Sequence, residues 1–443
     1  MSAGSTLNSI ELERARAVLE SMPSTGLFAG KEWLVSPEPF LLSADVVDQL
    51  ERLGHWLFKF VRATNHLYFR SVKSKKPGWI KDYFEAGKPA DLIRAARANP
   101  DVLPAVIRPD IILTEQGWTI TELDSVPGGI GLTDWLNRTY SDLGFDVIGT
   151  RNGMVDGFNR IFPKGVIAVS DESATYRPEM QWLVERLRSL RSSDWEVVRA
   201  EDWAFPQDVP VYRFFELFDL GKLQHKERLL EGVLNRTLQI TPPLKPFLEE
   251  KLAFGLFWSR PLAQFWRREL SDRHWKFLRS FFPHTWILDP TPLPHNAVIP
   301  GLEVQDWSEL KRFSQKQREL VLKISGFSER AWGSRGVFIA PDLPHHIWAE
   351  QIDKALAAFS TNPYILQRFY RGGLFEQKYF DTQSGEIRVL RGRVRLCPYY
   401  FVVSPREVVL GGVLATIVPP DKKIVHGMRD AIMVPAAVAP EGK

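Results

Sequence analysis

The sequence predicts a mixed α/β protein with a helical N-terminal layer, a central α/β unit and an antiparallel sheet accompanied by helices. Three observations predict this class. Apolar residues recur at helical spacing near the N-terminus, short apolar runs alternate with helical stretches over residues 165–240, and strand patterns dominate after residue 319. These changes divide the chain into three predicted regions, residues 1–100, 101–240 and 241–443.

The first region is expected to be helical over residues 8–22 and 43–70. In the second stretch Leu50, Leu53 and Leu57 fall on one stripe, because residues three or four apart lie on the same face of a helix. We expect that stripe to be buried against the rest of the protein.

The middle region opens with a predicted β-hairpin. Residues 107–113 form its first strand, a turn follows at 115–117, and residues 118–123 form its second strand. A helix is expected at 132–140. Alternating apolar runs and helical stretches then fill residues 165–240, which is typical of an α/β unit.

The last region is expected to begin with two helices, residues 244–258 and 266–282. The predicted strands after them are 320–324, 336–339, 364–369, 375–380, 387–396, 399–403 and 408–417. A helix at 346–358 interrupts these strands. We expect the strands to form one antiparallel sheet that this helix crosses.

The composition is that of an ordinary globular protein, 443 residues long, 44% hydrophobic and 25% charged. A net charge of +4 provides no general polyanion surface, so nucleic acid is not an expected partner. The single cysteine, Cys397, excludes an intrachain disulfide framework and a cysteine-rich zinc site, and we expect it in the core. No apolar stretch approaches the roughly 20 residues that cross a bilayer. The N-terminus also lacks a signal-peptide pattern, so we expect a cytoplasmic protein with no membrane partner.

Three carboxylates gather in the predicted hairpin, Asp110 on its first strand and Glu122 and Asp124 on its second. Glu122 and Asp124 are two residues apart and therefore share a face. Converging carboxylates repel one another unless a cation lies between them, and hard oxygen ligands of this kind suit magnesium together with nucleotide phosphates. The sequence thus predicts a magnesium site here, with a solvated hairpin face as the alternative.

A glycine-rich segment, residues 125–131, follows the acids and leads into the expected helix at 132–140. Such a segment can present backbone N–H groups and a helix N-terminus to an anion. A tight turn is the alternative. The segment lacks GxGxxG spacing, so it is not a dinucleotide-binding fingerprint.

A second candidate site lies where an apolar strand ends in Lys323 and a Gly/Ser-rich segment follows. A lysine can neutralise phosphate oxygens while such a segment closes over them with N–H and hydroxyl donors. The expected donors are Ser325, Gly326, Gly333, Ser334 and Gly336. No GxxxxGK[ST] motif is present, so this is not a Walker A loop, and a solvated hairpin loop is the alternative.

Two later strands carry further candidates. Gln367 lies in an apolar strand followed by two glycines, which could form an edge against which adenine packs; a plain sheet strand is the alternative. Arg391, Arg393 and Arg395 share one face of their strand, and guanidinium groups so placed bind a triphosphate or an acyl-phosphate. Arg395 is the expected functional residue because it adjoins an apolar run. The alternative is a solvated face paired with neighbouring acids.

Taken together, these motifs resemble the circularly permuted ATP-grasp proteins, and most closely the synthetase domain of glutathionylspermidine synthase and its bacterial relatives. That family has an acidic hairpin with the spacing of Asp110, Glu122 and Asp124, although it often has Asn at the last position. Its Pro-rich entry into a helix is similar to PPLKPFLEEKLAFGLFW, which indicates Lys251 as a nucleotide contact. Its lysine-and-glycine loop is similar to LKISGFSERAWGSRGV, which indicates Lys323.

The resemblance covers residues 105–420 in islands, with YILQRF as the adenine-edge strand and Arg395 as a phosphate contact. The order along the chain, acids first and lysines later, is that of the permuted family. The resemblance implies an ATP-dependent ligase that joins a small-molecule carboxylate to an amine through an acyl-phosphate, with ATP and Mg²⁺ as cofactors. It implies catalysis by Lys323 and Arg395, substrate and metal binding in residues 101–240, and nucleotide binding in residues 241–443.

Departures from the family leave the substrates undefined. The chain has no amidase domain, the stretch between Lys251 and Lys323 is long, and Trp332 adds bulk to the glycine loop. Two other functions fit the same residues: an ATP-binding phosphotransferase or other non-ligase ATP-grasp protein, and a non-catalytic scaffold of decayed fold. The retained acids and lysines argue against the scaffold. The sequence does not indicate the oligomeric state or the roles of residues 1–100 and His426.

Overall fold

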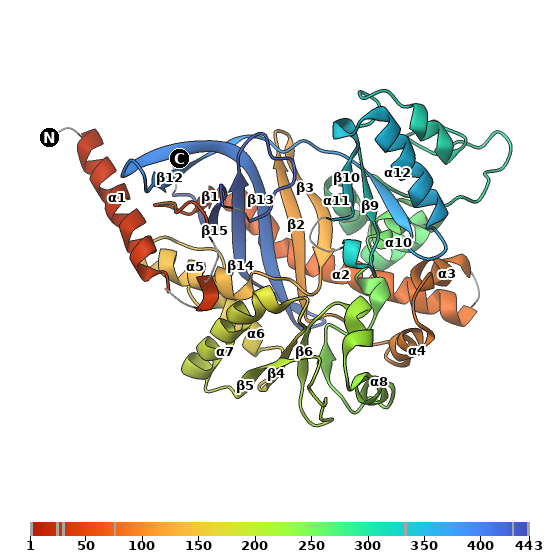
Figure 1. Cartoon of the computed structure of the whole chain (residues 1–443), viewed down its shortest axis with the longest axis horizontal. Coiled ribbons are helices and arrows are strands. Elements are labelled where there is room, and N and C mark those ends of the chain that lie inside the picture. Colours follow the sequence, from red (N-terminus) through yellow and green to blue (C-terminus); the bar gives the residue numbers. More distant parts are fainter. Residues whose placement is uncertain are drawn as a thin grey trace. The chain divides into compact units, whose positions relative to one another are not determined.

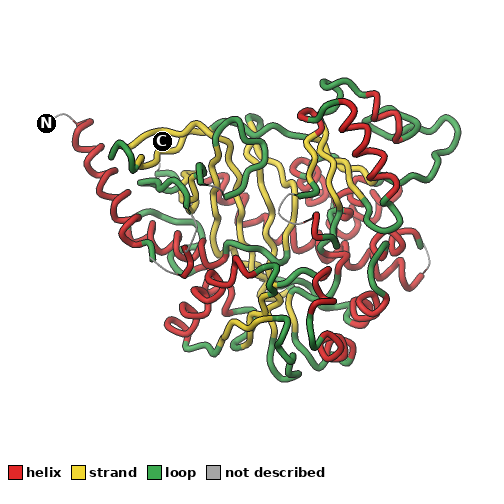
Figure 2. Tube along the Cα trace, in the orientation of Figure 1, coloured by secondary structure: helices red, strands yellow, loops and turns green. Residues whose placement is uncertain are grey.

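The computed structural model describes residues 3–23, 26–28, 32–74, 77–331, 335–427 and 429–440 (Figures 1 and 2). The chain forms two compact units, each assembled from segments far apart in the sequence. The first unit comprises Met1–Phe58, Leu103–Pro243 and Arg371–Lys443, and the second comprises Lys59–Val102 and Leu244–Tyr370. Two of these boundaries lie within three residues of the predicted divisions after residues 100 and 240. The predicted three-region organisation itself remains a prediction.

A seven-stranded sheet forms the centre of the first unit (Figure 1). Its order is β1-β15-β14-β13-β2-β3, and β12 pairs with β13 off this path. The bounds are β1 Phe40–Leu42, β2 Val106–Thr114, β3 Gly117–Asp124, β12 Phe375–Asp381, β13 Glu386–Ser404, β14 Glu407–Val418 and β15 Ile432–Val438. Neighbouring strands are antiparallel except β1 and β15, which are parallel. The pairing of β2 with β3 confirms the predicted hairpin.

Strand β13 corrects one expectation. The sequence predicts two separate strands here, 387–396 and 399–403. The structure has one continuous strand that includes Pro398, and its register with β14 shifts between Tyr399 and Tyr400. A bulge of this kind bends the strand and increases its local twist without ending it.

Three helices of the first unit contact this sheet, α1 Ala3–Ser21, α5 Ile130–Asp142 and α6 Gly153–Asn159. The unit also contains α7 Arg177–Arg191 and α8 Lys226–Leu234. Helix α5 contacts β14 and β15, and α6 contacts β13 and β14. The side chains of Trp135 and Leu136 on α5 are completely buried. The helices predicted at 8–22 and 132–140 are thus present as α1 and α5.

A four-stranded parallel sheet, β5-β4-β6-β7, completes the first unit. Its strands are β4 Gly165–Val169, β5 Trp195–Arg199, β6 Val211–Phe214 and β7 Ile240–Thr241. Helix α7 connects β4 to β5, and α8 connects β6 to β7. All five residues of β4 are buried, as expected for a central strand of a parallel sheet covered on both faces. The predicted α/β unit over 165–240 is confirmed.

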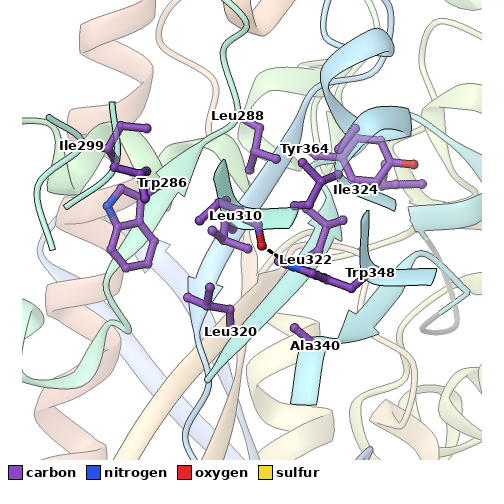
Figure 3. Packing of buried hydrophobic residues seen from close by; sticks show 14 residues of the cluster. Trp286, Leu288, Ile299, Leu310, Leu320, Leu322, Ile324, Ala340, Trp348 and Tyr364 are labelled. Atoms are coloured by element: carbon purple, nitrogen blue, oxygen red, sulfur yellow. Dashed lines mark hydrogen bonds between the residues drawn. The ribbon is translucent and has the colours of Figure 1, made fainter. Parts of the chain in front are cut away.

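The second unit is built around a four-stranded antiparallel sheet in the order β10-β9-β11-β8. The strands are β8 Thr285–Ile287, β9 Leu320–Ile324, β10 Val337–Ile339 and β11 Tyr364–Arg368, and α12 His345–Ala357 lies between β10 and β11 in the chain. An apolar core contains Trp286, Leu322 and Trp348 (Figure 3). The indole N–H of Trp348 donates to the Leu310 carbonyl at 2.7 Å, which satisfies a polar group that would otherwise be buried alone.

The other helices of the second unit include α3 Trp79–Glu85, α4 Ala90–Ala98, α9 Leu252–Trp258, α10 Ala263–Leu270 and α11 Asp272–Phe281. Helix α2, Ala44–Ser74, confirms the prediction at 43–70 and contains the boundary between the units. The helix predicted at 266–282 is instead broken into α10 and α11 at Ser271, whose φ of +70° cannot continue a right-handed helix. The helix predicted at 244–258 begins late, at Leu252, after a short 3₁₀ segment, Pro246–Leu248. No helix in the described ranges is both long and apolar enough to span a membrane.

The single C-terminal sheet that we predicted is wrong. The strands after residue 319 belong to two sheets, because β9, β10 and β11 pair within the second unit whereas β12, β13, β14 and β15 pair within the first. The chain leaves the second unit at Tyr370, just before two glycines. Strand partners are chosen by long-range packing, which a local apolar pattern does not specify.

Candidate active site

The predicted acids meet on the hairpin of the first unit. Asp110 on β2 is the register partner of Glu122 on β3, and Arg108 is the partner of Asp124. The period of two along each strand places residues 108 and 110 on one face and residues 122 and 124 on one face. A register shift between Asp110 and Ile111 marks a bulge at this point. The structure therefore brings the three predicted carboxylates together, with an arginine that the sequence analysis did not select.

Two guanidinium groups pair with two of these carboxylates, Asp110 and Asp124. The Nη2 atom of Arg108 lies 3.1 Å from Asp110 Oδ1 and 3.1 Å from Asp124 Oδ2. The Nη1 atom of Arg395 on β13 lies 3.0 Å from Asp110 Oδ2. The predicted Arg395 thus joins the acids, and Asp110 bridges two arginines from different strands.

Burial and charge shift the pKa values in this cluster. Burial alone would lower the pKa of Arg108, but Asp110 and Asp124 outweigh it and hold that pKa well above its usual value. Burial raises the pKa of Asp124, and the positive charge of Arg108 opposes the rise. Burial also raises the pKa of Cys397 to about 11, and its thiol lies 3.5 Å from Asp110 Oδ1. Cys397 is therefore a buried, protonated thiol, as expected of a core residue.

The carboxylate oxygens of this cluster are ligands that suit magnesium, but they do not form a complete metal site. Carboxylate oxygens from Asp110 and Glu122 are hard ligands on neighbouring strands, and Mg²⁺ takes one or two such ligands and completes its shell with water and phosphate. Across the described residues, no group of three or more His, Cys, Asp or Glu side chains is arranged to hold a metal ion. The positive charge beside Asp110 and Asp124 is supplied by arginine.

The glycine-rich segment after β3 forms hydrogen bonds with neighbouring parts of the protein. The Gly128 carbonyl accepts hydrogen bonds from Arg108 Nη1 at 3.1 Å and from the Tyr399 hydroxyl at 2.8 Å. Gly129 has a φ of +93°, and a Cβ there would lie 2.2 Å from the Tyr399 hydroxyl oxygen. The N–H of Gly131 donates to Glu179 Oε1 at 3.2 Å. The acceptor at this helix start is thus the protein's own buried Glu179 side chain, so the tight-turn alternative describes this segment.

In the second unit a buried polar row crosses the sheet. Lys323 on β9 is 6% exposed, and its Nζ donates to Gln367 Oε1 on β11 at 2.9 Å. The amide of Gln367 in turn donates to the Thr285 hydroxyl on β8 at 3.2 Å. Two residues predicted from separate motifs are therefore direct partners, because β9 and β11 are adjacent antiparallel strands.

Lys251 is brought to the segment that follows Lys323. Its backbone N–H donates to the Ser325 carbonyl at 2.9 Å, and the N–H of Leu252 donates to the Ser325 hydroxyl at 2.9 Å. Ser325 thereby caps the first turn of α9 from a distant part of the chain. The residues that the resemblance assigns to a nucleotide thus converge within the second unit, although the Ser325 side chain already has a structural role.

Glu250 and Lys88 form a buried ion pair beside Ser325, and neither was predicted from the sequence. Their side chains are each 1% exposed, with Lys88 Nζ on Glu250 Oε1, and the Ser325 hydroxyl donates to Glu250 Oε2. A Cβ on Gly326 would lie 3.1 Å from the carboxyl carbon of Glu250. Glu250 precedes Lys251 and could have been suspected from that position, whereas no local pattern distinguishes Lys88 from a surface lysine.

Of the remaining predicted donors, Gly336 lies in the described part of the chain and two others do not. The carbonyl of Gly336 accepts from the Ile324 N–H at 3.2 Å, where β9 meets β10. Gly333 and Ser334 lie outside the described residues. Another arginine of β13, Arg388, pairs with Asp381 at 2.8 Å. This pair matches the alternative given above, a solvated strand face whose arginines pair with neighbouring acids. His426 is exposed.

Comparison with known proteins identifies a related fold. No family model matches the chain, and no curated protein matches it. A glutathione synthetase like-effector from Globodera pallida is 12% identical and matches 99% of this chain and 98% of its own, with a TM-score of 0.57. A protein from Methylobacillus flagellatus assigned as a gamma-glutamylcysteine synthetase is 11% identical over 88% of this chain and 87% of its own, with a TM-score of 0.41. The first of these shares the mixed α/β fold of this chain over its whole length.

Proposed function

We propose that this protein is an ATP-dependent ligase that joins a carboxylate to an amine, on a circularly permuted ATP-grasp fold similar to the synthetase domain of glutathionylspermidine synthase. The observation that carries the proposal is the convergence of Lys251, Lys323, Ser325 and Gln367 in the second unit. The fold shared with a glutathione synthetase like-effector over nearly the whole chain supports it.

In this proposal the nucleotide is ATP and its phosphates are offset by Lys251 and Lys323. The adenine packs at the strand of Gln367, and backbone and hydroxyl groups of the segment after Lys323 complete the site. The proposed donors are Ser325, Gly326, Gly333, Ser334 and Gly336. Two buried ammonium groups suit a triphosphate because phosphoryl transfer depends on positioning and charge more than on covalent help from the protein.

The acids of the hairpin would hold magnesium through Asp110 and Glu122, with Asp124 beside them. The metal would supply charge neutralisation to the phosphates. Arg395, fixed by Asp110, is proposed to contact the transferred phosphoryl group. The substrate carboxylate oxygen displaces ADP from the γ-phosphorus, and the amine nitrogen then displaces phosphate from the acyl carbon and gives an amide.

Replacement of Lys323 by methionine tests the nucleotide site. Lys323→Met keeps a side chain of similar length in the buried position, so we expect the fold to persist and Mg-ATP affinity to fall by about tenfold or more, measured by calorimetry. Lys354→Met is the matched control, because Lys354 is exposed and pairs along its own helix with Glu350. Equal affinity for ATP in the two variants would remove Lys323 from the site.

One observation favours a second candidate, ATP-dependent phosphoryl transfer without ligation. Asp110 and Asp124 are already engaged by arginines, an arrangement that also suits binding of an anionic phosphoryl acceptor after a rearrangement of the pairs. Release of ADP and phosphate distinguishes the candidates. Ligation requires that release depend on an added amine, whereas release that never responds to any amine supports phosphoryl transfer.

A further inference from the structure

The buried ion pair of the second unit has no part in the proposed ligase chemistry, although it adjoins the proposed nucleotide residues. Lys88 lies in the turn between α3 and α4, and Glu250 directly precedes Lys251 in the chain. The side chains of Lys88 and Glu250 are each 1% exposed, and Lys88 Nζ contacts Glu250 Oε1. Taking two charged groups out of water can cost more than their attraction returns, so stability alone does not explain these charges.

The second carboxylate oxygen of Glu250 is bound by Ser325, which belongs to the proposed nucleotide site. The Ser325 hydroxyl donates to Glu250 Oε2 and accepts the N–H of Leu252 at 2.9 Å. Because a carboxylate can only accept hydrogen bonds, Glu250 fixes the direction of the hydroxyl proton and leaves the oxygen lone pairs for Leu252. The Ser325 carbonyl accepts the Lys251 N–H at 2.9 Å, and the Ser325 N–H donates to the Pro363 carbonyl at 3.0 Å. Ser325 thus joins the ion pair to the start of α9 and to the residue before β11.

The segment that follows this serine packs on the same ion pair. A Cβ on Gly326 would lie 3.1 Å from the Glu250 carboxyl carbon and 3.1 Å from the Glu249 carbonyl oxygen, so the backbone approaches closely where no side chain intervenes. The φ of Phe327 is +46°, which is unfavourable for a bulky residue and persists only where the surroundings fix it. Lys88 Nζ lies 5.8 Å from the centroid of the Phe327 ring, within the range of a cation–π contact. The ion pair therefore adjoins three consecutive residues of the chain.

We propose that Lys88 and Glu250 are positioning residues of the nucleotide site, which set the course of residues 325–327 and hold them against the first turn of α9. This inference rests on the proposed function, in which this segment and the start of α9 contact the nucleotide. Lys88 acts through Glu250, and Glu250 acts through the Ser325 hydroxyl. The pair carries no net charge, so its effect on an anionic nucleotide comes from position rather than from attraction.

Calorimetric titration of the double variant Lys88→Met/Glu250→Gln with Mg-ATP tests the positioning role. Both side chains keep a similar size and the net charge is unchanged, so attraction alone predicts an unaltered affinity. Positioning predicts an affinity weaker by about tenfold or more. The single variant Glu250→Gln separates the two effects by sign, because removal of a negative charge strengthens anion binding by attraction, whereas loss of position weakens it. The double variant carries the test alone if the single variant does not fold.

Leu310→Ala is the matched control for lost stability. Leu310 is completely buried in the apolar core of the same unit, so its truncation leaves a cavity and destabilises the fold. The ion pair is untouched, and the folded variant should bind Mg-ATP as the wild type does.

Hydrogen exchange without nucleotide reports the position of the segment directly. The amide hydrogens of Lys251 and Leu252, which Ser325 accepts, should exchange faster in the double variant than in Leu310→Ala. Equal Mg-ATP affinity in the wild type and the double variant, an equal loss in Leu310→Ala, or equal exchange at these amides overturns this inference alone. Absence of Mg-ATP binding by the wild type overturns the proposed function, and this inference with it.

Discussion

At the scale of single residues, the second unit shows three ways of burying a lysine. A buried ammonium loses its hydration, so each one needs partners inside the protein. The pairs are Lys88 with the Glu250 carboxylate, Lys323 with the Gln367 amide, and Lys245 with Asn65 Oδ1, the Pro100 carbonyl and the Val102 carbonyl. Burial lowers the pKa of Lys245 to about 7. The carboxylate partner compensates the charge of Lys88 inside the protein, which suits Lys88 to a structural role.

The Lys88–Glu250 pair makes the first residue-scale prediction. Glu250→Gln leaves the Lys88 ammonium buried without a counter-charge, so we expect a loss of about 3–5 kcal/mol in the free energy of unfolding. The double variant Lys88→Met/Glu250→Gln should recover part of that loss. Urea unfolding measures both. Glu350→Gln, which breaks an exposed pair with Lys354, is the control and should cost less than about 1 kcal/mol. A loss for Glu250→Gln no larger than the control's would contradict the prediction.

The second residue-scale prediction concerns His284 and the dependence of stability on pH. Its ring is stacked between Trp258 and Trp286, with ring centroids 4.4 Å and 4.3 Å away. Burial, followed by the charges of Arg279 and Arg368, lowers the pKa of His284 to about 4. The unfolded chain, with an ordinary histidine pKa of about 6.5, then takes up a proton before the folded chain does. The contribution of His284 to the free energy of unfolding is therefore fully present above pH ~6.5 and is lost as the pH falls toward ~4.

Urea unfolding at a series of pH values between 7.5 and 5, for the wild type and for His284→Gln, checks this. The wild type should lose stability faster on acidification, with a difference in slope of up to about 1.4 kcal/mol per pH unit. Carboxylate titration is common to both proteins and cancels in the comparison. Parallel slopes would show that His284 titrates normally in the folded protein.

Residues of the candidate site were predictable only where a strand pattern or a resemblance marked them. Asp110, Glu122 and Asp124 follow from the hairpin period, and the structure places them together. Arg108 carries the same period-two signal as Asp110 and was available from sequence. Lys88 was not, because its partner lies more than 150 residues away in the chain and nothing local distinguishes it.

At the scale of elements, local signals predicted where helices and strands occur but not where they stop or what they pair with. The hairpin β2–β3, the parallel unit over 165–240 and α12 were predicted. The break at Ser271 was not, because it depends on one backbone angle that the apolar period of α10 and α11 does not report. Strand β15 was missed because Pro435 and a run of small residues hide its pattern.

The turn between α3 and α4, which carries Lys88, makes an element-scale prediction. Gly87 has a φ of +69°, and a Cβ there would lie 1.9 Å from the Thr361 carbonyl oxygen. Gly87→Ala must therefore displace backbone, and we expect a loss on the order of 3 kcal/mol or more in the free energy of unfolding. Gly385→Ala is the control: its φ is similar, +74°, but its Cβ meets no atom within 4 Å, so about 1–2 kcal/mol is expected. Equal losses, measured in urea, would show that the turn relaxes freely.

At the scale of the whole molecule, each unit contributes one part of the proposed chemistry. The acids and Arg395 belong to the first unit, and the lysines and Gln367 belong to the second. Each unit is assembled from two or three separate segments of the chain, so neither corresponds to one continuous stretch of sequence. A ligase of the proposed type needs both sets of residues in the same step.

Turnover of a double variant tests that dependence. Glu122→Gln and Lys323→Met should each lower kcat/KM for ATP-dependent phosphate release by about a hundredfold or more, as loss of one charge-stabilising group in a reaction centre does. Combined, they should lower it by clearly less than the product of the two effects, because groups acting on one transition state are not additive. Purely multiplicative effects would show that the two units act independently.

By itself the sequence determined the local elements, the mixed fold class and the residue types available for binding a metal and a phosphate, because periodicity and turn chemistry are local properties. Tertiary structure alone decided that the late strands divide between two sheets, that Glu179 occupies the start of α5, and that Lys88 pairs with Glu250. Those outcomes depend on contacts between segments distant in the chain, which are selected by the packing of the entire unit.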